Sequence, residues 1–554
     1  MSTAIVYQPE QRLELPDGQR RLIALTIYLG FAALAVGVIN GLAQALSYAH
    51  INIFQYYPGM NSYYQGLTVH AVFNAIIFTF AFANGFVTLT MARGLNRKVH
   101  SGLLIAAFGS LALGSLLAAF AMFSGRASVL YTFYAPLQAH WTFYLGLVLI
   151  VVSTWITSLN LFVTLRSWRR EHRGERIPLL AFISVVTYVF WDISSLGIAV
   201  ETVVFVLPWS LGLVATTDPL MDRTLFWFTG HPIVYFWLLP VYISWYAMIP
   251  KQVGGKLFSD SAVRAVFLMF LCIIPIGMHH QYMDPGISSK LKFATAILTF
   301  TVFLPSLLTA FSVMYALEIG GRKRGGTGLV GWFFALPWSD PSVAAQVLAM
   351  LVFLLGGITG LMNASYSMNI EIHNTTFVPG HFHLTVGTAV ALSVMGIAYW
   401  LVPYLEHRKL WSRGLAQAQA WIYAAGVLIF ARGMISGGLA GMPRRTAIAL
   451  APYSEPSWHL AGIITAVGGS LMVIGALLFF LDIGLTVVIG EREEPAEIPF
   501  TETIHAPATV GWEVSFDHLR YWIAIAFVLI VVMYGPFVAT HIPLASVGVP
   551  FKRF

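Results

Sequence analysis

Residues 376–404 read TFVPGHFHLTVGTAVALSVMGIAYWLVPY and contain no Asp, Glu, Lys or Arg. A helix needs about 20 predominantly apolar residues to cross the hydrocarbon core of a membrane. Similar stretches recur along the chain between clusters of charged residues, proline and glycine. Together they predict an all-α integral membrane protein, a polytopic bundle of about 13 transmembrane helices, near residues 22–48, 63–93, 101–124, 138–166, 179–208, 224–250, 261–281, 288–318, 342–362, 376–404, 416–439, 457–488 and 519–542.

The composition supports this fold class. Of the 554 residues, 58% are hydrophobic and 10% are charged, and the mean hydropathy is +0.75. Soluble proteins contain about 25% charged residues, so this composition excludes a secreted, disordered or nucleic-acid-binding protein. No sequence repeat and no soluble insertion is visible. We therefore expect residues 1–554 to form one transmembrane domain, in which residues 1–21 are a cytoplasmic N-terminal segment.

The distribution of positive charge predicts the orientation. If the N-terminus is cytoplasmic, five of the six cytoplasmic loops are rich in Lys or Arg, among them residues 166–176 and 320–324. The opposite loops hold few basic residues. Because cytoplasmic loops carry an excess of Lys and Arg, the N-terminus is predicted inside and the C-terminus outside. We expect a multi-pass protein of the cell (inner) membrane.

Six histidines fall within the predicted spans. Ionisable residues at membrane depth are costly and usually functional, and neutral imidazole is a common metal ligand. A single such histidine is equally well explained by a hydrogen bond between helices. Six together favour metal binding, and they are His70, His231, His279, His280, His381 and His383.

The spacing of His381 and His383 limits what they bind. Two residues on an α-helix are about 200° apart around its axis, so these two side chains are expected to serve two metals on opposite sides of one helix. His70 stands alone in its span and is a candidate second axial ligand for one of these centres, as in haem proteins with two axial histidines.

A second group of histidines is predicted to share one metal. His279 and His280 are consecutive. Pro275 on one side and Pro285 on the other are expected to distort their helix so that both histidines converge. His231 on the preceding span completes three imidazoles, which suit copper or zinc. Tyr235 lies four residues after His231, on the same helix face, which places a phenol beside this metal. A packing aromatic is the alternative for Tyr235.

These motifs resemble those of subunit I of the haem-copper oxygen reductases, the terminal oxidases of respiration. The resemblance covers nearly all the predicted spans, and its motifs occur in the family's order. They are HPIVYFWLLP (231–240), MHHQYMDPG (278–286), VPGHFHLTVGTAV (378–390) and PRR (443–445).

The resemblance implies two haems and one copper ion, copper B. His70 and His383 correspond to the ligands of a low-spin haem of b-type, and His381 to the ligand of a high-spin haem of a-type. In this family the tyrosine at the position of Tyr235 is covalently linked to the first copper histidine and supplies an electron and a proton. The copper B ligands are then His231, His279 and His280.

The subclass follows from one position. The A-family oxidases carry a glutamate where this chain has Ile233, so the sequence is similar to the B family, in particular the ba-type cytochrome c oxidases. These use one proton path, which ends at Tyr235. Hydroxyl groups both donate and accept hydrogen bonds, as a relay requires, although Ser and Thr also bond to their own helix carbonyls. The matching positions are Tyr242, Tyr246, Ser306, Thr309 and Ser312.

The outer ends of the haems are expected near residues 369–373 and the PRR motif. Arg444 and Arg445 fit as partners of the haem propionates, although long basic side chains also reach toward lipid phosphates. His373 matches the family. Asn369 stands where the B-family pattern has an aspartate, which leaves the proton-loading site open, and Glu371 lies two residues further on.

Two carboxyl residues in the fifth predicted span stand outside these assignments. Asp192 and Glu201 are nine residues apart, about 180° out of phase on a helix, so we expect them not to share a site. Glu201 is a candidate for a position near water. Protonated carboxyl groups that pack helices together are the alternative for both residues.

The sequence therefore predicts a membrane oxidase that reduces O2 to water and translocates protons. The single cysteine, Cys272, cannot build the binuclear copper A centre. We therefore expect a subunit II that carries copper A and receives electrons from cytochrome c or a similar donor, and a small single-helix subunit in contact with membrane lipid.

Three alternatives remain. Nitric oxide reduction by the related reductases is disfavoured by Tyr235, because those enzymes use glutamates in place of the tyrosine. Quinol oxidation is not distinguished by this chain. A histidine-bearing transporter without a cofactor is the rival of another class, although the internal repeats common in transporters are not visible here.

Overall fold

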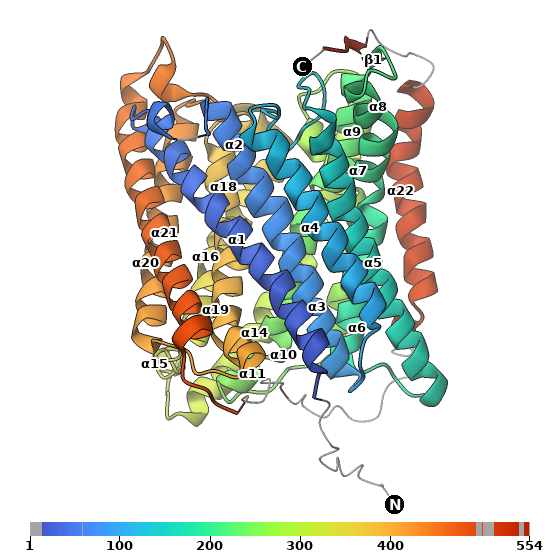
Figure 1. The fold of residues 1–554 in the computed structure, drawn as a ribbon, viewed down its shortest axis with the longest axis vertical. Helices are drawn as coiled ribbons and strands as arrows, with labels where there is room; N and C mark the ends of the chain where they lie inside the picture. Colours follow the sequence, from blue (N-terminus) through green and yellow to red (C-terminus); the bar gives the residue numbers. More distant parts are fainter. Residues whose placement is uncertain (1–13, 58, 495–500, 502–514, 542–547, 553–554) are drawn as a thin grey trace, which may run out of the picture.

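The structure, a computed structural model, is a bundle of long helices whose axes run roughly parallel (Figure 1). It describes residues 14–57, 59–494, 501, 515–541 and 548–552. Within these ranges, 11 helices are long and apolar enough to cross a membrane, or up to 13 if each of two bent helix pairs counts as one span. The prediction of a polytopic all-α membrane protein is confirmed, and the thirteen predicted spans include the two bent pairs.

The spans of the first part of the chain are long helices, two of which contain a π-helical turn. They are α1 (Asp17–Tyr48), α2 (Tyr63–Val72) continued by the π turn η2 (Phe73–Phe78) and α3 (Thr79–Gly94), α4 (Ser101–Phe123), α5 (Trp141–Glu171), and the span of α6 (Leu179–Ser194), α7 (Leu196–Val200), the π turn η3 (Glu201–Val206) and α8 (Leu207–Ser210). The last span bends by 41° between α6 and α7. The loops hold a 3₁₀ turn, η1 (Phe54–Tyr56), and the short strand β1 (Thr216–Thr217).

The remaining spans include the second bent pair. They are α9 (Pro219–Gly230) with α10 (Pro232–Ala247) and α11 (Ile249–Gln252), α12 (Asp260–Cys272) with η4 (Ile274–Gln281), α13 (Ser289–Thr301) with α14 (Phe303–Lys323), α16 (Pro341–Ala364), α18 (Phe377–Thr385) with the π turn η5 (Val386–Leu392) and α19 (Ser393–Glu406), α20 (Arg413–Leu439), α21 (Pro456–Ile489) and α22 (Leu519–His541). Shorter elements are α15 (Gly331–Phe334), α17 (Tyr366–Ile372), η6 (Ile448–Leu450) and strand β2 (Val549–Pro550).

Small residues bring neighbouring helices close together. A Cβ atom added to Gly114 on α4 would lie 2.6 Å from the carbonyl oxygen of Gly146 on α5, and the reverse holds at Gly146. A Cβ atom at Gly433 on α20 would lie 2.5 Å from the hydroxyl oxygen of Thr465 on α21. Close backbone approach of this kind is how membrane helices gain packing energy where the hydrophobic effect no longer drives association.

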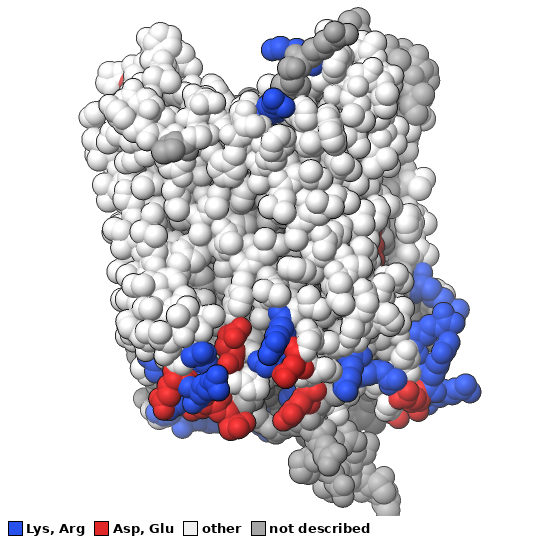
Figure 2. Space-filling model, in the orientation of Figure 1, with Lys and Arg blue, Asp and Glu red and all other residues white. Residues whose placement is uncertain are grey.

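The charged residues gather at one end of the bundle on the face shown in Figure 2, the end at which α1 begins (Figure 1). One ion-pair cluster involves Arg264 of α12, which is 1% exposed and lies 2.6 Å from Asp260 and 2.8 Å from Asp517. At the opposite end β1 pairs with β2. The described part of the chain therefore begins at one end of the bundle and finishes at the other, as an odd number of spans requires.

The first helix begins before the first predicted span. The sequence places a cytoplasmic segment at residues 1–21, and residues 1–13 lie outside the described part of the chain. Helix α1 already begins at Asp17, preceded by Pro16. An acidic residue in the first turn suits the positive end of the helix dipole. The helix therefore begins in the polar residues that precede the predicted span.

Asp192 and Glu201 lie in different elements. The hydroxyl of Ser158 on α5 donates a 2.5 Å hydrogen bond to the carboxylate of Asp192 on α6. Glu201 opens the π turn η3, is fully buried, and its two carboxylate oxygens have no hydrogen-bond partner among the described residues. The two carboxyl groups thus have different surroundings.

Candidate functional site

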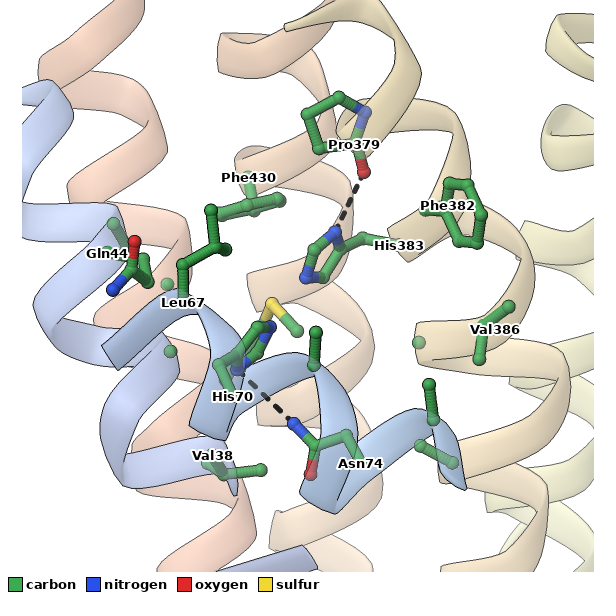
Figure 3. Close-up of a pocket in the computed structure, with 18 of the residues that line it drawn as sticks. Val38, Gln44, Leu67, His70, Asn74, Pro379, Phe382, His383, Val386 and Phe430 are labelled. Carbon is green, nitrogen blue, oxygen red and sulfur yellow. Dashed lines mark hydrogen bonds between the residues drawn. The ribbon is translucent and has the colours of Figure 1, made fainter. Parts of the chain in front are cut away.

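Two cavities lie inside the bundle, on either side of the helix formed by α18 and η5. The first, of about 250 Å³, is lined by His70 and His383 (Figure 3). The second, of about 190 Å³, is lined by His381 and by the histidines of the second predicted group. Val378, Phe382 and Val386 line both cavities. This helix is therefore the wall between two neighbouring sites.

His381 and His383 face different cavities, as their spacing predicts. His383 lines the first cavity and His381 the second. The Nδ1 atom of His381 lies 3.1 Å from the carbonyl oxygen of Gly356 and 3.0 Å from the hydroxyl of Thr359 on α16. Because these partners occupy Nδ1, the Nε2 atom of His381 is left to bind a metal.

His70 and His383 form a pair across the first cavity. Their rings are parallel within 9°, with centroids 6.3 Å apart. The Nδ1 atom of His70 donates to the carbonyl oxygen of Gly37 and that of His383 to the carbonyl oxygen of Pro379, each at 2.8 Å. A metal binds an imidazole nitrogen at about 2 Å, so the two free Nε2 atoms fit one haem iron between them.

The three histidines of the second group come together. Their candidate ligand atoms all lie within 4.8 Å of one another, and Nδ1 of His231 is 2.9 Å from Nε2 of His280. The Nδ1 atom of His279 is held at 3.0 Å by the hydroxyl of Thr299, and the ring of His280 stacks on Trp227 at 3.9 Å. Three imidazole nitrogens this close together could hold one metal ion.

Proline residues shape the backbone that carries these histidines. His231 caps the start of α10 and is followed by Pro232, whose missing N–H suits the first position of a helix. The span of α12 and η4 bends by 50°, and Pro275 has non-helical φ and ψ angles of −81° and 47°. The bend that the sequence predicted at Pro275 turns the consecutive histidines toward α10.

Tyr235 lies beside the histidine cluster. Its hydroxyl is 2.9 Å from Nε2 of His231, and its side chain lines the second cavity. Nε2 is the ring nitrogen of His231 that does not face His280. The hydroxyl of Tyr235 thus contacts His231, as the four-residue spacing of the two residues predicts.

The hydroxyl residues of the predicted proton path are partly connected. The Tyr246 hydroxyl donates to Thr309 at 2.8 Å, and Ser306 lines the second cavity. The hydroxyls of Ser306 and Thr309 also donate to carbonyls of their own helix, those of Val302 and Pro305. Both interpretations of these residues therefore coexist in the structure.

Two further residues of the predicted path are buried. Tyr242 is fully buried, and its hydroxyl has no hydrogen-bond partner within the part of the chain that the structure describes. Ser312 is 2% exposed on α14. A continuous proton path through these positions requires water between the side chains.

Arg444 connects the two cavities at the end of the bundle opposite the charged one. Its side chain lines both, and its Nη2 atom donates to the side chain of Asn374 at 3.0 Å. Burial and the neighbouring Arg445 lower the pKa of Arg444 to about 10, and the guanidinium of Arg445 lies over the ring of Tyr131. Two adjacent cations of this kind fit anionic groups such as haem propionates.

The structure places Glu371 apart from Asn369 and His373. Asn369 and His373 line the second cavity, whereas Glu371 is exposed. Asn369 is 5% exposed, and its amide oxygen has no hydrogen-bond partner among the described residues. Burial and Arg444 lower the pKa of His373 to about 4. Glu371 therefore does not supply a carboxylate at the position of Asn369.

The sequence did not reveal several side chains that hold the histidines in place. Thr299, Thr359 and Trp227 touch the cluster or its neighbour His381 and look like ordinary helix residues in the sequence. Another is Asp284, which binds Arg223 through two 2.9 Å hydrogen bonds and so ties the loop after His280 to α9. Its place in the motif MHHQYMDPG was the available signal.

Known proteins are similar to this chain in sequence and share its fold. The family model described as cytochrome c and quinol oxidase polypeptide I matches residues 21–471. Cytochrome c oxidase subunit 1 of Thermus thermophilus is 42% identical over 522 residues, which cover 92% of this chain and 92% of that protein. A probable quinol oxidase subunit 1 of Staphylococcus haemolyticus is 27% identical and covers 67% of this chain and 55% of that protein.

A solved structure extends the comparison. A heme-copper terminal oxidase dimer studied by cryo-electron microscopy aligns with a TM-score of 0.92 and 35% identity, over 97% of this chain and 96% of that one. The fold and site define a membrane-bound haem-copper oxidase. This chain belongs to the cytochrome c and quinol oxidase polypeptide I family. Membership implies that it is a multi-pass enzyme subunit that holds haem and copper B and works in a complex with other subunits.

Proposed function

We propose that this chain is the catalytic subunit of a B-family cytochrome c oxidase that reduces O2 to water and translocates protons across the cell (inner) membrane. The reaction takes up four electrons and four protons for each O2 and releases two water molecules. The observation that carries the proposal is the second cavity, where three converging histidines, the phenol of Tyr235 and His381 line one space. A transporter without cofactors has no need for this arrangement.

Each metal has its own set of residues in this proposal. The low-spin haem, of b-type, is held by His70 and His383, and the high-spin haem, of a-type, by His381. The copper B ligands are those of the histidine cluster, namely His231, His279 and His280. When bound, these groups supply electron transfer and an open metal position for oxygen.

The surrounding residues orient the ligands before any chemistry occurs. Carbonyl oxygens of Gly37, Pro379 and Gly356 hold the Nδ1 atoms of the three proposed haem ligands, which fixes each ring with Nε2 toward its cavity. Tyr235 contributes a proton and an electron from its hydroxyl, which lies 2.9 Å from Nε2 of His231.

Protons reach Tyr235 along the hydroxyl residues of α10 and α14. Tyr246 and Thr309 already share a hydrogen bond, and Ser306 lies at the cavity. Ser312 and Tyr242 complete the path through water. At the other end of the cavity, Arg444, Arg445, His373 and Asn369 would meet the propionates and the protons that leave.

Electrons enter through a partner in this proposal. The chain has one cysteine, Cys272, and a copper A centre needs more than one thiolate. A subunit II that carries copper A therefore takes electrons from cytochrome c, and a small single-helix subunit accompanies it. Quinol oxidation and nitric oxide reduction are the alternatives within the same superfamily.

Oxygen consumption by the purified complex tests the proposal. The complex is supplied in turn with reduced cytochrome c, with a reduced quinol and, without oxygen, with nitric oxide. We expect rapid O2 uptake with cytochrome c only, together with co-purification of a copper A subunit. Activity with quinol alone, or active enzyme without such a subunit, would contradict the assigned donor, whereas turnover of nitric oxide alone would contradict the reaction.

A further inference from the structure

The ring of His70 has two polar neighbours at Nδ1. The carbonyl oxygen of Gly37 on α1 lies 2.8 Å away, and the amide nitrogen of Asn74, one turn further along the helix of His70, lies 3.3 Å away. Figure 3 shows the amide of Asn74 directed at this ring. The Nδ1 atom of the opposite ligand, His383, bonds to the carbonyl of Pro379. The two proposed ligands of the low-spin haem are therefore held differently.

Two glycines of α1 make this arrangement possible. A Cβ atom added to Gly37 would overlap the side-chain amide of Asn74, and one added to Gly41 would lie 2.7 Å from the ring of His70. The backbone of α1 thus packs directly against the imidazole and the amide together. This close packing confines the amide of Asn74 to the position beside Nδ1.

The balance of donors and acceptors points to the orientation of this amide. A metal-bound imidazole keeps its proton on the other ring nitrogen, so Nδ1 of His70 is a donor. The NH2 group of Asn74 then faces another donor, while the buried Asn74 oxygen has no hydrogen-bond partner among the described residues. Amide oxygen and nitrogen exchange places by a half-turn of the side chain. That half-turn gives the oxygen a donor.

We propose that Asn74 is a positioning residue that tunes the low-spin haem, with its amide oxygen accepting a second hydrogen bond from Nδ1–H of His70. Hydrogen bonds to the outer nitrogen make a histidine ligand more basic. A more basic ligand stabilises the oxidised iron, so Asn74 lowers the midpoint potential of this haem. The inference rests on the proposed function, because it needs His70 to bind haem iron.

The test is the variant Asn74→Leu, which keeps a similar shape and removes the acceptor. Asn40→Leu is the matched control, because Asn40 is a buried amide of α1 that donates to the carbonyl of Val36 in its own helix. Potentials are measured by spectroelectrochemical titration of the assembled complex. We expect the ratio of reduced to oxidised low-spin haem at a fixed potential to rise about tenfold in Asn74→Leu, which equals 59 mV for one electron. The high-spin haem and Asn40→Leu should keep their wild-type potentials.

An Asn74→Leu complex that retains low-spin haem with the wild-type potential overturns the proposal and leaves the proposed function intact. If Asn74→Leu does not assemble, pulsed electron paramagnetic resonance of the oxidised wild-type enzyme decides. Its remote imidazole nitrogens should give two different quadrupole couplings, because the Nδ1 atoms of His70 and His383 are bonded differently, and identical couplings overturn the proposal. A wild-type complex without any low-spin haem signal instead contradicts the assignment of His70 itself.

Discussion

The Nε2 atom of His231 lies 2.9 Å from the hydroxyl oxygen of Tyr235, one helical turn further along α10. The other ring nitrogen of His231 faces His280 in the histidine cluster. One imidazole thus touches both the proposed copper position and a phenol. Because Tyr235 follows His231 by one turn of the same helix, the helix itself places the phenol beside the proposed copper position.

Tyr235→Phe should reduce O2 consumption by about 100-fold or more, the scale of contribution made by a positioned proton donor. The haem absorption bands should stay largely unchanged, because the substitution removes a hydroxyl but no metal ligand. Steady-state O2 uptake and the optical spectrum of the same sample check both expectations. Tyr399→Phe is the control, since that buried hydroxyl bonds to Gln419 away from the site. An active Phe variant at position 235 would refute the role of the phenol.

Thr309→Val should slow proton-coupled turnover by about tenfold or more, because it interrupts a relay whose full contribution reaches about 100-fold or more. The Val side chain fills the same space but accepts no proton from Tyr246. Thr88→Val is a matched control, because the buried Thr88 hydroxyl donates to a carbonyl of its own helix. Turnover of Thr309→Val and Thr88→Val is compared by stopped-flow measurement, and only Thr309→Val should be slower than the wild type. Equal rates for the wild type and Thr309→Val would assign Thr309 to helix packing alone.

His280→Asn should lose the copper ion of the histidine cluster, so that the copper content of the complex falls from three ions to the two of copper A, and it should retain both haems. The imidazole of His280 faces Nδ1 of His231, whereas the histidines proposed for the haems lie on α2 and α18. Metal analysis of the purified complex, normalised to protein, measures copper and iron together. His373→Asn should keep its copper, because His373 is outside the cluster. Full copper content in His280→Asn would show that the three histidines are not its ligands.

Arg264→Met should destabilise the fold by about 1–3 kcal/mol, the cost of leaving charged hydrogen-bond partners without their donor. Asp260 and Asp517 lose the nearer guanidinium and keep only Arg176, at 3.2 and 3.5 Å. The thermal unfolding midpoint in detergent should fall clearly. Arg322→Met, which breaks a half-exposed pair with Glu318, should change stability by less than about 1 kcal/mol. Similar midpoints for both variants would argue against a structural role for the Arg264 cluster.

Hydropathy predicted the spans because every membrane helix must be apolar over about 20 residues. It did not predict the 41° bend between α6 and α7, because the two helices together pass as one apolar span. The π turns after His70 and His383 were also missed, since they depend on how the helix packs rather than on composition. In contrast, the proline at position 275 predicted the bend before His279.

The candidate site was predictable to the extent that helix geometry fixes it. The separation of His381 and His383 into two cavities follows from their spacing alone, and so does the contact of Tyr235 with His231. Contacts between distant segments were not predictable. Asn74 looks like any amide in a helix until Gly37 and His70 are seen beside it.

The most direct test of the central claim is a reduced-minus-oxidised optical spectrum of the purified complex, recorded with and without carbon monoxide. Two haem signals should appear, and carbon monoxide should shift only one. In the proposed assignment His70 and His383 would both bind the iron of one haem, whereas His381 alone would hold the other haem beside the histidine cluster. A spectrum with no haem bands, or with both haems shifted by carbon monoxide, would contradict the assignment of these ligands.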